Sequence, residues 1–225
     1  MLALALLPLA GCDSDNDQDR DRDRIVNVDG DGYTEVDLVA LDEWLRTIPN
    51  EPLSDAESAA ILFAREEEKM DRDAFRIFDD QYALDAFTRM TESEQTHMSA
   101  VGLLIQKYGL TDPVTNDATG VFENQDILAL YEDFIDQGDD SAAAALAAGA
   151  GTQELTIMDL ADGLEVTDNR DVECVFENLQ KGSRNHLRRL VRLLDNRNVD
   201  YVPTYLPQAD FDAIVDSPME QGTAC

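Results

Sequence analysis

Residues 87–105, FTRMTESEQTHMSAVGLLI, decide the fold, because they place a Glu-x-x-His step inside an apolar helical pattern. At about 3.6 residues per turn, Glu94 and His97 share one helix face with Phe87, Val101 and Ile105. A carboxylate and an imidazole therefore point where core side chains are expected. A buried carboxylate is costly unless it is compensated. A metal ion would compensate Glu and His together, and a hydrogen-bonded structural pair is the alternative.

The composition is that of one acidic domain with appendages. The chain has 225 residues, of which 44% are hydrophobic, and 48 acidic against 17 basic residues give a formal net charge of -31. Such a charge repels nucleic acids and anionic lipid surfaces, which excludes both as main partners. Because lysine is scarce and aspartate abundant, most of this acidity is interpreted as a solvated surface suited to a salty habitat. Homo-oligomerisation is left open.

The first twelve residues, MLALALLPLAGC, are too short to span a bilayer and end in small residues. Residues 9–12 resemble a bacterial lipobox, in which Cys12 receives lipid and becomes the mature N-terminus. This resemblance predicts a lipoprotein signal peptide at residues 1–12 and a membrane partner reached through the lipid anchor. The implied location is the cell envelope, on the periplasmic or extracellular face. The usual basic n-region is missing, so either the true start lies upstream or the resemblance is accidental.

Residues 13–35 are predicted to be an acidic disordered linker, because they contain few apolar residues. Within this region, residues 27–37 resemble the front half of an EF-hand calcium loop, with oxygen ligands at alternate positions and Gly32 at the sixth. The twelfth position is Leu38 instead of an acidic residue. A turn inside an acidic linker explains the same letters.

Helical periodicity and capping signals predict an all-α bundle over residues 36–206. The expected elements are a short segment at 36–47, four long helices and a short helix at 126–137. The first long helix begins at the capping box Ser54-Asp-Ala-Glu57, and the second stops at Gly109. The long connection between the second and third long helices permits a crossover along the bundle. The chain from residue 201 onward is predicted to be extended and to pack over the bundle, and residues 207–225 are predicted to be a C-terminal tail that ends in a flexible acidic stretch.

Further polar residues are predicted to face the interior of this bundle. In the triplet Glu66-Glu67-Glu68, Glu67 lies nearest the apolar stripe, Glu66 is the alternative, and Glu68 falls outside it. One of these acids is expected to face inward and the other two to be solvated. Glu154 lies on the inward flank of the third long helix. His186 lies on the apolar stripe of the fourth, and it and His97 are the two histidines of the chain.

Residues 53–206 resemble a bacterial and archaeal ferritin-like family that is catalogued as a domain of unknown function. The resemblance rests on four motifs: Arg65-Glu-Glu-Glu-Lys69, Ser93-Glu-Gln-Thr-His-Met98, Gly182-Ser-Arg-Asn-His186-Leu, and Tyr201-x-Pro203-x-Tyr205. It implies a ferritin-like four-helix bundle with a long crossover between helices two and three. It also implies a metal site whose ligands follow the chain order Glu67, Glu94, His97, Glu154 and His186.

One position departs from the ferritin pattern. A ferritin-type fourth helix carries Glu three residues before its His, and this chain has Ser183 there. With one carboxylate fewer, the site could hold one metal, hold two with water or Glu66 filling in, or hold none. The remaining ligand types suit iron, manganese or zinc.

Three functions are compatible with the sequence. The first is a lipid-anchored iron protein, a candidate iron-dependent oxidoreductase that oxidises ferrous iron or handles peroxide. The second is a non-catalytic bundle that binds partners in the cell envelope and carries a structural metal or a buried Glu-His network. The third is a surface protein tuned by calcium at residues 27–37. Nucleophilic hydrolysis is disfavoured because the chain has no Gly-x-Ser-x-Gly elbow.

The remaining cysteines, Cys174 and Cys225, pair in an oxidising envelope or stay as two free thiols. The sequence leaves both states open. Cys174 is expected on the polar side of its helix, where it could reach the C-terminal tail.

Overall fold

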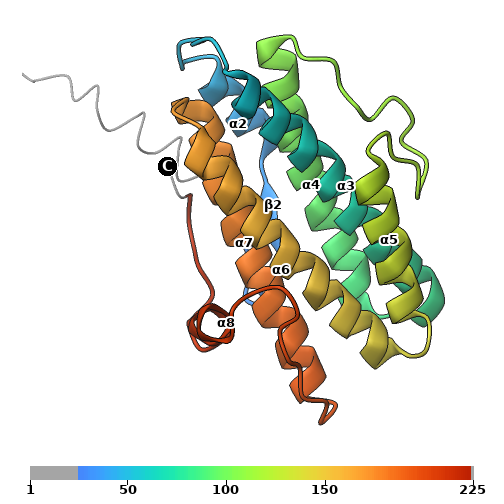
Figure 1. Cartoon of the computed structure of the whole chain (residues 1–225). Coiled ribbons are helices and arrows are strands. Elements are labelled where there is room, and N and C mark those ends of the chain that lie inside the picture. The colour runs from blue at the N-terminus through green and yellow to red at the C-terminus, as the bar shows by residue number, and fades with distance from the viewer. Residues whose placement is uncertain (1–24, 224–225) are drawn as a thin grey trace, which may run out of the picture.

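A computed structural model describes residues 25–223, and helices dominate this part of the chain (Figure 1). The predicted all-α class is confirmed. The helices are α2 (Leu38–Leu45), α3 (Asp55–Tyr82), α4 (Asp85–Tyr108), α5 (Gln125–Gly138), α6 (Ala142–Val166), α7 (Arg170–Asp195) and α8 (Gln208–Val215). The part of the chain that the structure describes contains no helix long and apolar enough to cross a membrane.

The helix ends follow from local sequence signals. The Ser54 side chain accepts a hydrogen bond from the Glu57 backbone N–H, and the Glu57 carboxylate accepts one from the Ser54 N–H, which completes the predicted capping box. Gly109 ends α4 in the left-handed conformation, with φ at 65°. The third long helix, α6, continues past Gly163 to Val166. Gly163 lies against the Phe176 ring, where a Cβ atom would be 2.7 Å from the ring.

The long helices α3, α4, α6 and α7 pack around a shared interior, in which α3 contacts α4 and α6, and α7 contacts the same two helices (Figure 1). Glu57, at the start of α3, accepts hydrogen bonds from Thr167 and Asn169, between α6 and α7. Tyr108, at the end of α4, donates to Asp171, at the start of α7. Both α4 and α6 therefore end at the same end of the bundle. The connection through α5 must return along the length of the bundle.

The interior consists of two apolar clusters with a polar layer between them. One cluster contains Met70 of α3 and Phe87 of α4, and the other contains Ile61 of α3 and Val101 of α4. On α7, residues up to Leu179 belong to the second cluster and residues from Leu187 onward to the first. Each of these helices therefore passes from one apolar cluster to the other, and the buried polar residues lie at the transition.

Residues 25–36 form a β-hairpin, so the prediction of a disordered linker through residue 35 is wrong for this part. Strand β1 (Val26–Val28) pairs antiparallel with β2 (Thr34–Val36), with Val26 opposite Val36. The hairpin buries Ile25, Val26, Tyr33 and Val36, and β2 packs against α4 and α7. These few apolar residues suffice because the bundle supplies the other side of the interface. The rest of the predicted linker, the signal peptide and Cys12 lie outside the described residues.

The loop of this hairpin occupies the stretch that resembles a calcium loop. One Asp29 carboxylate oxygen accepts hydrogen bonds from the backbone N–H groups of Asp31, Gly32 and Tyr33. Asp29 also pairs with Arg89, and Asp31 pairs with Arg189. The carboxylates of the loop thus stabilise a turn and neutralise arginines. This arrangement agrees with the alternative that residues 27–37 form a turn.

The C-terminal tail is more ordered than the sequence predicted, because residues 208–215 form α8 and Phe211 is buried against the bundle. Beyond it, Arg184 and Arg188 of α7 pair with Glu220. Cys174 is buried and disulfide-bonded, whereas it was expected on the polar side of its helix. Cys225, the partner considered for it, lies outside the described residues.

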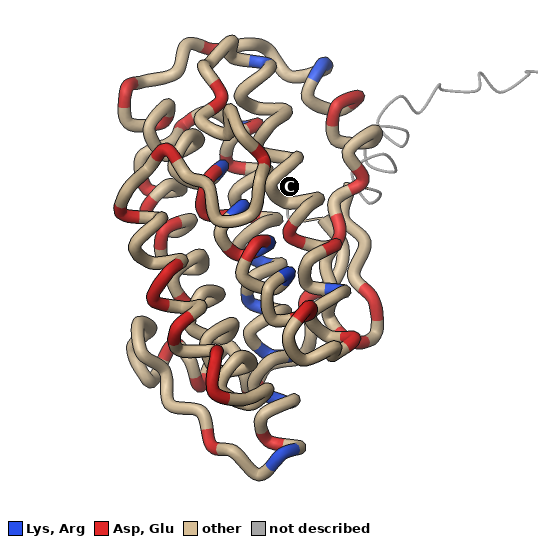
Figure 2. Tube along the Cα trace, turned by 90° about the vertical axis from the view of Figure 1, so that its right-hand side faces the viewer, with Lys and Arg blue, Asp and Glu red and all other residues tan. Residues whose placement is uncertain are grey.

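Acidic residues occur on nearly every element, whereas Lys and Arg are sparse (Figure 2). Several of the basic residues are buried, among them Lys69 and Arg72, each 0% exposed. Their charges are compensated inside the protein, because Lys69 and Arg72 both pair with the buried Asp73.

Candidate metal centre

Three side chains from two helices meet in the polar layer. Glu94 and His97 lie one turn apart on α4, His186 comes from α7, and all three are 0% exposed. Their candidate ligand atoms lie within 4.8 Å of one another. Glu94 Oε2 is 2.8 Å from His97 Nδ1, and Glu94 Oε1 is 2.9 Å from His186 Nδ1. The two imidazoles stack with ring centroids 5.4 Å apart, so the Glu94 carboxylate bridges them.

The hairpin fixes the far side of both imidazoles. His97 Nε2 is 2.7 Å from the Thr34 carbonyl oxygen, which can only accept a hydrogen bond. His97 Nε2 therefore carries a proton, and in the neutral ring the lone pair of Nδ1 faces the acidic cluster. His186 Nε2 is 3.0 Å from Ser93 Oγ, and Ser93 in turn donates to the same Thr34 carbonyl. Such outer contacts orient histidine ligands in metal sites.

Gly182 of α7 permits this placement of His97. A Cβ atom at position 182 would lie 2.6 Å from His97 Cε1 and 3.0 Å from its Nε2. Any side chain there would displace the imidazole from the Thr34 carbonyl. The glycine of the Gly182-Ser-Arg-Asn-His186 motif thus has a packing role in the cluster.

Helix α3 contributes two more acids, Glu68 and Asp71, one turn apart and each 0% exposed. Glu68 Oε2 lies 3.4 Å from His97 Nδ1. Asp71 accepts hydrogen bonds from Gln153 and Thr156 of α6, at 2.7 and 2.9 Å. Gln153 also donates to Glu94 at 3.0 Å, so it links the acids of α3 and α4.

Much of the unsatisfied polarity of the protein is concentrated here. Among the described residues, nine buried side-chain atoms lack a hydrogen-bond partner, and five belong to this cluster. They are Glu68 Oε1, Glu68 Oε2, Asp71 Oδ1, Glu94 Oε2 and His97 Nδ1. Buried polar groups are normally paired. Three of these atoms face one another, because His97 Nδ1 lies 2.8 Å from Glu94 Oε2 and 3.4 Å from Glu68 Oε2. The cluster therefore requires positive charge, which either a proton on His97 Nδ1 or a metal cation supplies.

The pKa values of the cluster show the same requirement. Burial raises the pKa of Glu68 to about 7, partly opposed by His97, and it also holds the pKa of Asp71 well above its usual range. Burial would likewise raise the pKa of Glu94, but the two imidazoles pull it well below its ordinary value. For His97, burial lowers the pKa, whereas Glu94 and Glu68 raise it to a net value of about 10. Without another cation, the cluster therefore retains protons at neutral pH.

Comparison with known proteins shows the family of the chain. Residues 57–218 match the family described as an uncharacterized protein domain (DUF2202). The chain belongs to this family. It is 41% identical over 180 residues to the uncharacterized protein MJ0754 of Methanocaldococcus jannaschii, which covers 80% of this chain and 97% of the relative. The crystal structure of the hypothetical protein MJ0754 superposes with a TM-score of 0.75 at 42% identity, covering 77% of this chain and 99% of that one.

The DUF2202 match begins at residue 57, after the hairpin. Thr34, whose carbonyl contacts His97 and Ser93, thus comes from outside the matched segment. In this DUF2202 protein, the hairpin therefore adds a contact to the cluster from outside the matched segment.

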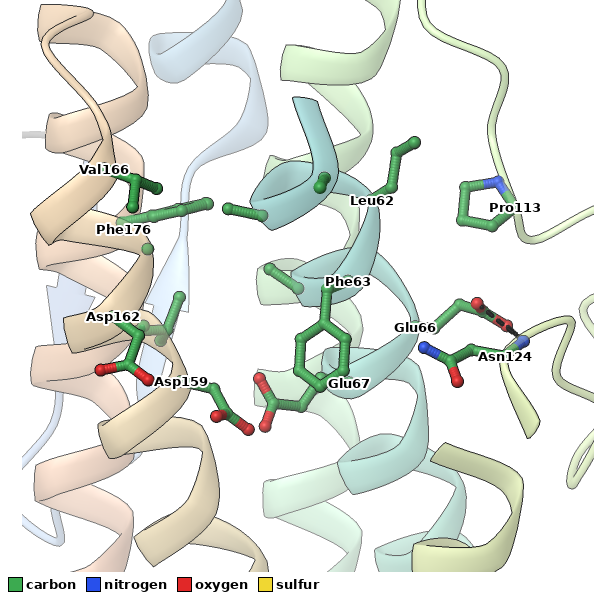
Figure 3. Close-up of a pocket in the computed structure, with 15 residues that line it drawn as sticks. Leu62, Phe63, Glu66, Glu67, Pro113, Asn124, Asp159, Asp162, Val166 and Phe176 are labelled. Atoms are coloured by element: carbon green, nitrogen blue, oxygen red, sulfur yellow. Dashed lines mark hydrogen bonds between the residues drawn. The ribbon is translucent and has the colours of Figure 1, made fainter. Parts of the chain in front are cut away.

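The structure brings together Glu94, His97 and His186 of the sequence-predicted ligands, but places the others elsewhere. Glu154 accepts hydrogen bonds from the Tyr201 hydroxyl and from the backbone N–H groups of residues 204–206, so it holds the tail to the bundle. Glu66 accepts from the backbone N–H groups of Glu123 and Asn124, at the start of α5. Glu67 faces Asp159 of α6 across a pocket, where burial and Asp159 hold its pKa well above the usual range (Figure 3).

The expectation that two acids of the 66–68 triplet are solvated is wrong, because all three are buried. Residues 110–124 cover Glu66, α6 covers Glu67, and Glu68 faces the two histidines. Sequence reasoning missed Glu68, Asp71 and Gln153. A usable signal was the three-residue spacing of Glu68 and Asp71, which repeats the one-turn step of Glu94 and His97. Ser183, the position where the ferritin pattern has Glu, donates a hydrogen bond to the Leu179 carbonyl of its own helix.

Proposed function

We propose that this DUF2202 protein binds a metal ion through Glu94, His97, His186 and Glu68, inside a ferritin-like four-helix bundle. The observation that carries the proposal is the convergence of buried carboxylate oxygens on two buried histidines. Asp71 adds a third carboxyl group and Gln153 orients it. A divalent cation would neutralise these carboxylates without burying uncompensated charge.

The arrangement of the helices supports the ferritin-like part of the proposal. Pairwise packing of α3 with α4 and of α6 with α7, joined by a connection that runs back along the bundle, is the arrangement of ferritin-like proteins. In such bundles, ligands project inward from facing helices at mid-length. Glu68 and Asp71 on α3, and Glu94 and His97 on α4, are two such ligand pairs.

Iron is the metal that we propose. Manganese and zinc are alternatives, because they also bind imidazole and carboxylate ligands. When bound, iron would supply redox chemistry toward oxygen or peroxide. Glu94 would hold the two imidazoles apart and supply negative charge, while the Thr34 carbonyl fixes the protonated nitrogen of His97. The apolar clusters on either side of the polar layer exclude water from it. We therefore infer ferrous oxidation or peroxide handling as the activity.

A second candidate is a non-catalytic bundle with a buried Glu-His network, acting as a structural or partner-binding module of the cell envelope. It is favoured by the separations of 2.8 and 2.9 Å between Glu94 and the two imidazoles, which suit imidazolium-carboxylate contacts without a metal. In that case, protein that binds no metal would remain fully stable. The metal measurements below separate the two candidates.

The proposed location is the cell envelope, with the domain held at the membrane by lipid on Cys12. Residues 1–12 lie outside the described part of the chain. Mass spectrometry of protein expressed in a bacterial host, with and without a Cys12→Ser substitution, tests the anchor. A diacylglyceryl mass on the wild-type chain alone would support it, and an unmodified wild-type chain would contradict it.

The ligand set can be tested by comparing buried glutamates. Glu68→Gln is expected to weaken ferrous iron binding by about 10- to 100-fold, because it replaces a carboxylate ligand beside His97 with a neutral amide. Glu67→Gln and Glu154→Gln change equally buried glutamates of the same bundle and are expected to change the affinity by less than about threefold. Anaerobic equilibrium dialysis measures all four proteins. Equal losses in Glu67→Gln and Glu68→Gln would contradict this assignment.

Activity is tested on the iron-loaded full chain. Consumption of oxygen and of hydrogen peroxide is followed after anaerobic loading with ferrous iron, beside Glu68→Gln at saturating iron. A turnover that exceeds that of free iron and falls in Glu68→Gln supports the proposed activity. Turnover at the rate of free iron would contradict the proposed activity and favour the non-catalytic bundle.

The stability of the metal-free protein should decrease as the pH rises. Glu68 and His97 have folded-state pKa values of about 7 and about 10, raised from 4.5 and 6.5. Their stabilising contributions are complete below the unfolded pKa values and are lost as the pH passes the folded ones. The pKa of Glu94 is lowered, so its contribution stays constant above about pH 5.

Asp71 and Glu67, whose pKa values are also raised, add losses of the same sign. We therefore expect the unfolding free energy of metal-free protein to fall by at least about 1 kcal/mol per pH unit between about pH 5 and about pH 9. Urea unfolding in the presence of a chelator measures this slope. Bound metal should remove the loss, because metal binds the deprotonated side chains. A metal-free protein that becomes more stable over the same interval would contradict these protonation states.

A further inference from the structure

A second feature of the molecule, separate from the histidine cluster, is a pocket between α3 and α6 (Figure 3). Its volume is about 550 Å³, within the range usual for small-molecule sites. Phe63, Leu160 and Phe176 supply apolar walls. The exposed residues Asp162 and Val166 lie at its mouth, and the buried Glu67 lies at its floor.

Glu67 is the unusual group of this pocket. Its side chain is 2% exposed, and its carboxyl group is hydrogen-bonded to the carboxyl group of Asp159. The group that faces it is another acid, Asp159 of α6 (Figure 3). Buried carboxylates normally have a donor or a cation as partner. The floor of the pocket thus presents a carboxyl pair that lacks a positively charged partner.

The charges of the lining residues limit what can bind. Four of the lining residues are acidic, namely Glu66, Glu67, Asp159 and Asp162, and none is Lys, Arg or His. Glu66 is already occupied by the backbone of residues 123–124. Anions are therefore excluded from the floor. The aromatic and aliphatic walls favour an organic body over a hydrated inorganic cation.

We propose that this pocket binds an organic cation, a primary amine with an apolar chain, whose ammonium group lies between Glu67 and Asp159. The ammonium group offers three hydrogen-bond donors and a positive charge to two carboxyl groups that otherwise have only each other as partners, and the chain displaces water from the apolar walls toward the mouth. The strong negative charge of the surface would concentrate such cations near the mouth. Neither metal binding nor activity at the histidine cluster is required for this site.

Hexylammonium is the probe, and hexanol and ammonium chloride are its matched controls. Hexanol keeps the chain without the charge, and ammonium keeps the charge without the chain. Isothermal titration of the full chain at about physiological salt is expected to show hexylammonium binding at least about tenfold more tightly than either control. Equal affinity of hexanol and hexylammonium would overturn the cation class, and equal affinity of ammonium would overturn the role of the apolar walls.

Variants locate the site. Glu67→Gln and Asp159→Asn should each weaken hexylammonium binding by about tenfold and leave hexanol unchanged. Ala60→Leu, which fills the pocket, should weaken both, whereas Asp80→Asn removes the same charge at an exposed position outside the pocket and should change neither. Circular dichroism checks that each variant is folded. Wild-type affinity in both Glu67→Gln and Ala60→Leu, or an equal loss in Asp80→Asn, would overturn the proposal.

Discussion

Glu94→Gln is expected to weaken metal binding by at least about 100-fold, because Glu94 contacts both imidazoles. Removing a direct ligand should cost more affinity than removing an outer-sphere partner, which typically costs about 10- to 100-fold. The same change should destabilise metal-free protein by about 3–5 kcal/mol, since it leaves protonated His97 buried with less compensation. For a domain of this size, that corresponds to a decrease in melting temperature on the order of 10 °C. Equilibrium dialysis and calorimetry measure the two effects.

Glu92→Gln is the matched control for this variant. Glu92 lies two residues away on the same helix and is exposed, so the change should alter neither metal binding nor stability by a measurable amount. If Glu94→Gln binds metal as tightly as Glu92→Gln, the carboxylate between the two histidines is not a ligand and the proposed centre is wrong.

Asp73→Asn is expected to destabilise the protein by about 3–5 kcal/mol without changing the ligands of the metal centre. Asp73 is 0% exposed and accepts hydrogen bonds from Lys69 at 2.5 Å and from Arg72 at 2.8 Å. It also accepts from the Gly120 backbone N–H, so it holds residues 118–120 against α3. The substitution leaves two buried cations with an incomplete set of partners. Chemical denaturation measures the loss, and hydrogen exchange should show faster opening of residues 118–120.

Asp117→Asn tests whether burial is the cause of that loss. Asp117 also pairs with Arg72, at 2.7 Å, but its side chain is 62% exposed. Removing its charge should cost no more than about 1 kcal/mol. Equal destabilisation by the two substitutions would show that the effect depends on Arg72 alone and not on the buried position of Asp73.

The sequence predicted the long helices and three members of the cluster because those signals are local. A helix of about 3.6 residues per turn places Glu94, His97 and His186 on apolar faces, whatever lies opposite them. Capping at Ser54 and termination at Gly109 are equally local. The inward direction of these side chains could therefore be read from the residues around them.

The remaining members depended on neighbours that are distant in the sequence. Glu67 and Glu68 are adjacent, and only the positions of α4 and α6 decide which of them faces the histidines. Glu154 is indeed buried, but its partners are residues 201–206 of the tail, about fifty positions away. Thr34 reaches the cluster from a hairpin whose short strands resembled an acidic linker. Periodicity reports burial, but it does not report which group a buried side chain meets.

Metal content is the most direct test of the proposed iron centre. Full-length protein, purified without chelator and without nickel affinity chromatography, would be analysed by inductively coupled plasma mass spectrometry beside the Glu94→Ala/His97→Ala double variant. We expect near-stoichiometric iron in the wild-type protein and its loss in the folded variant. Absence of metal from both proteins would contradict this expectation, and the Glu94, His97 and His186 cluster would then be a buried polar network of a structural protein.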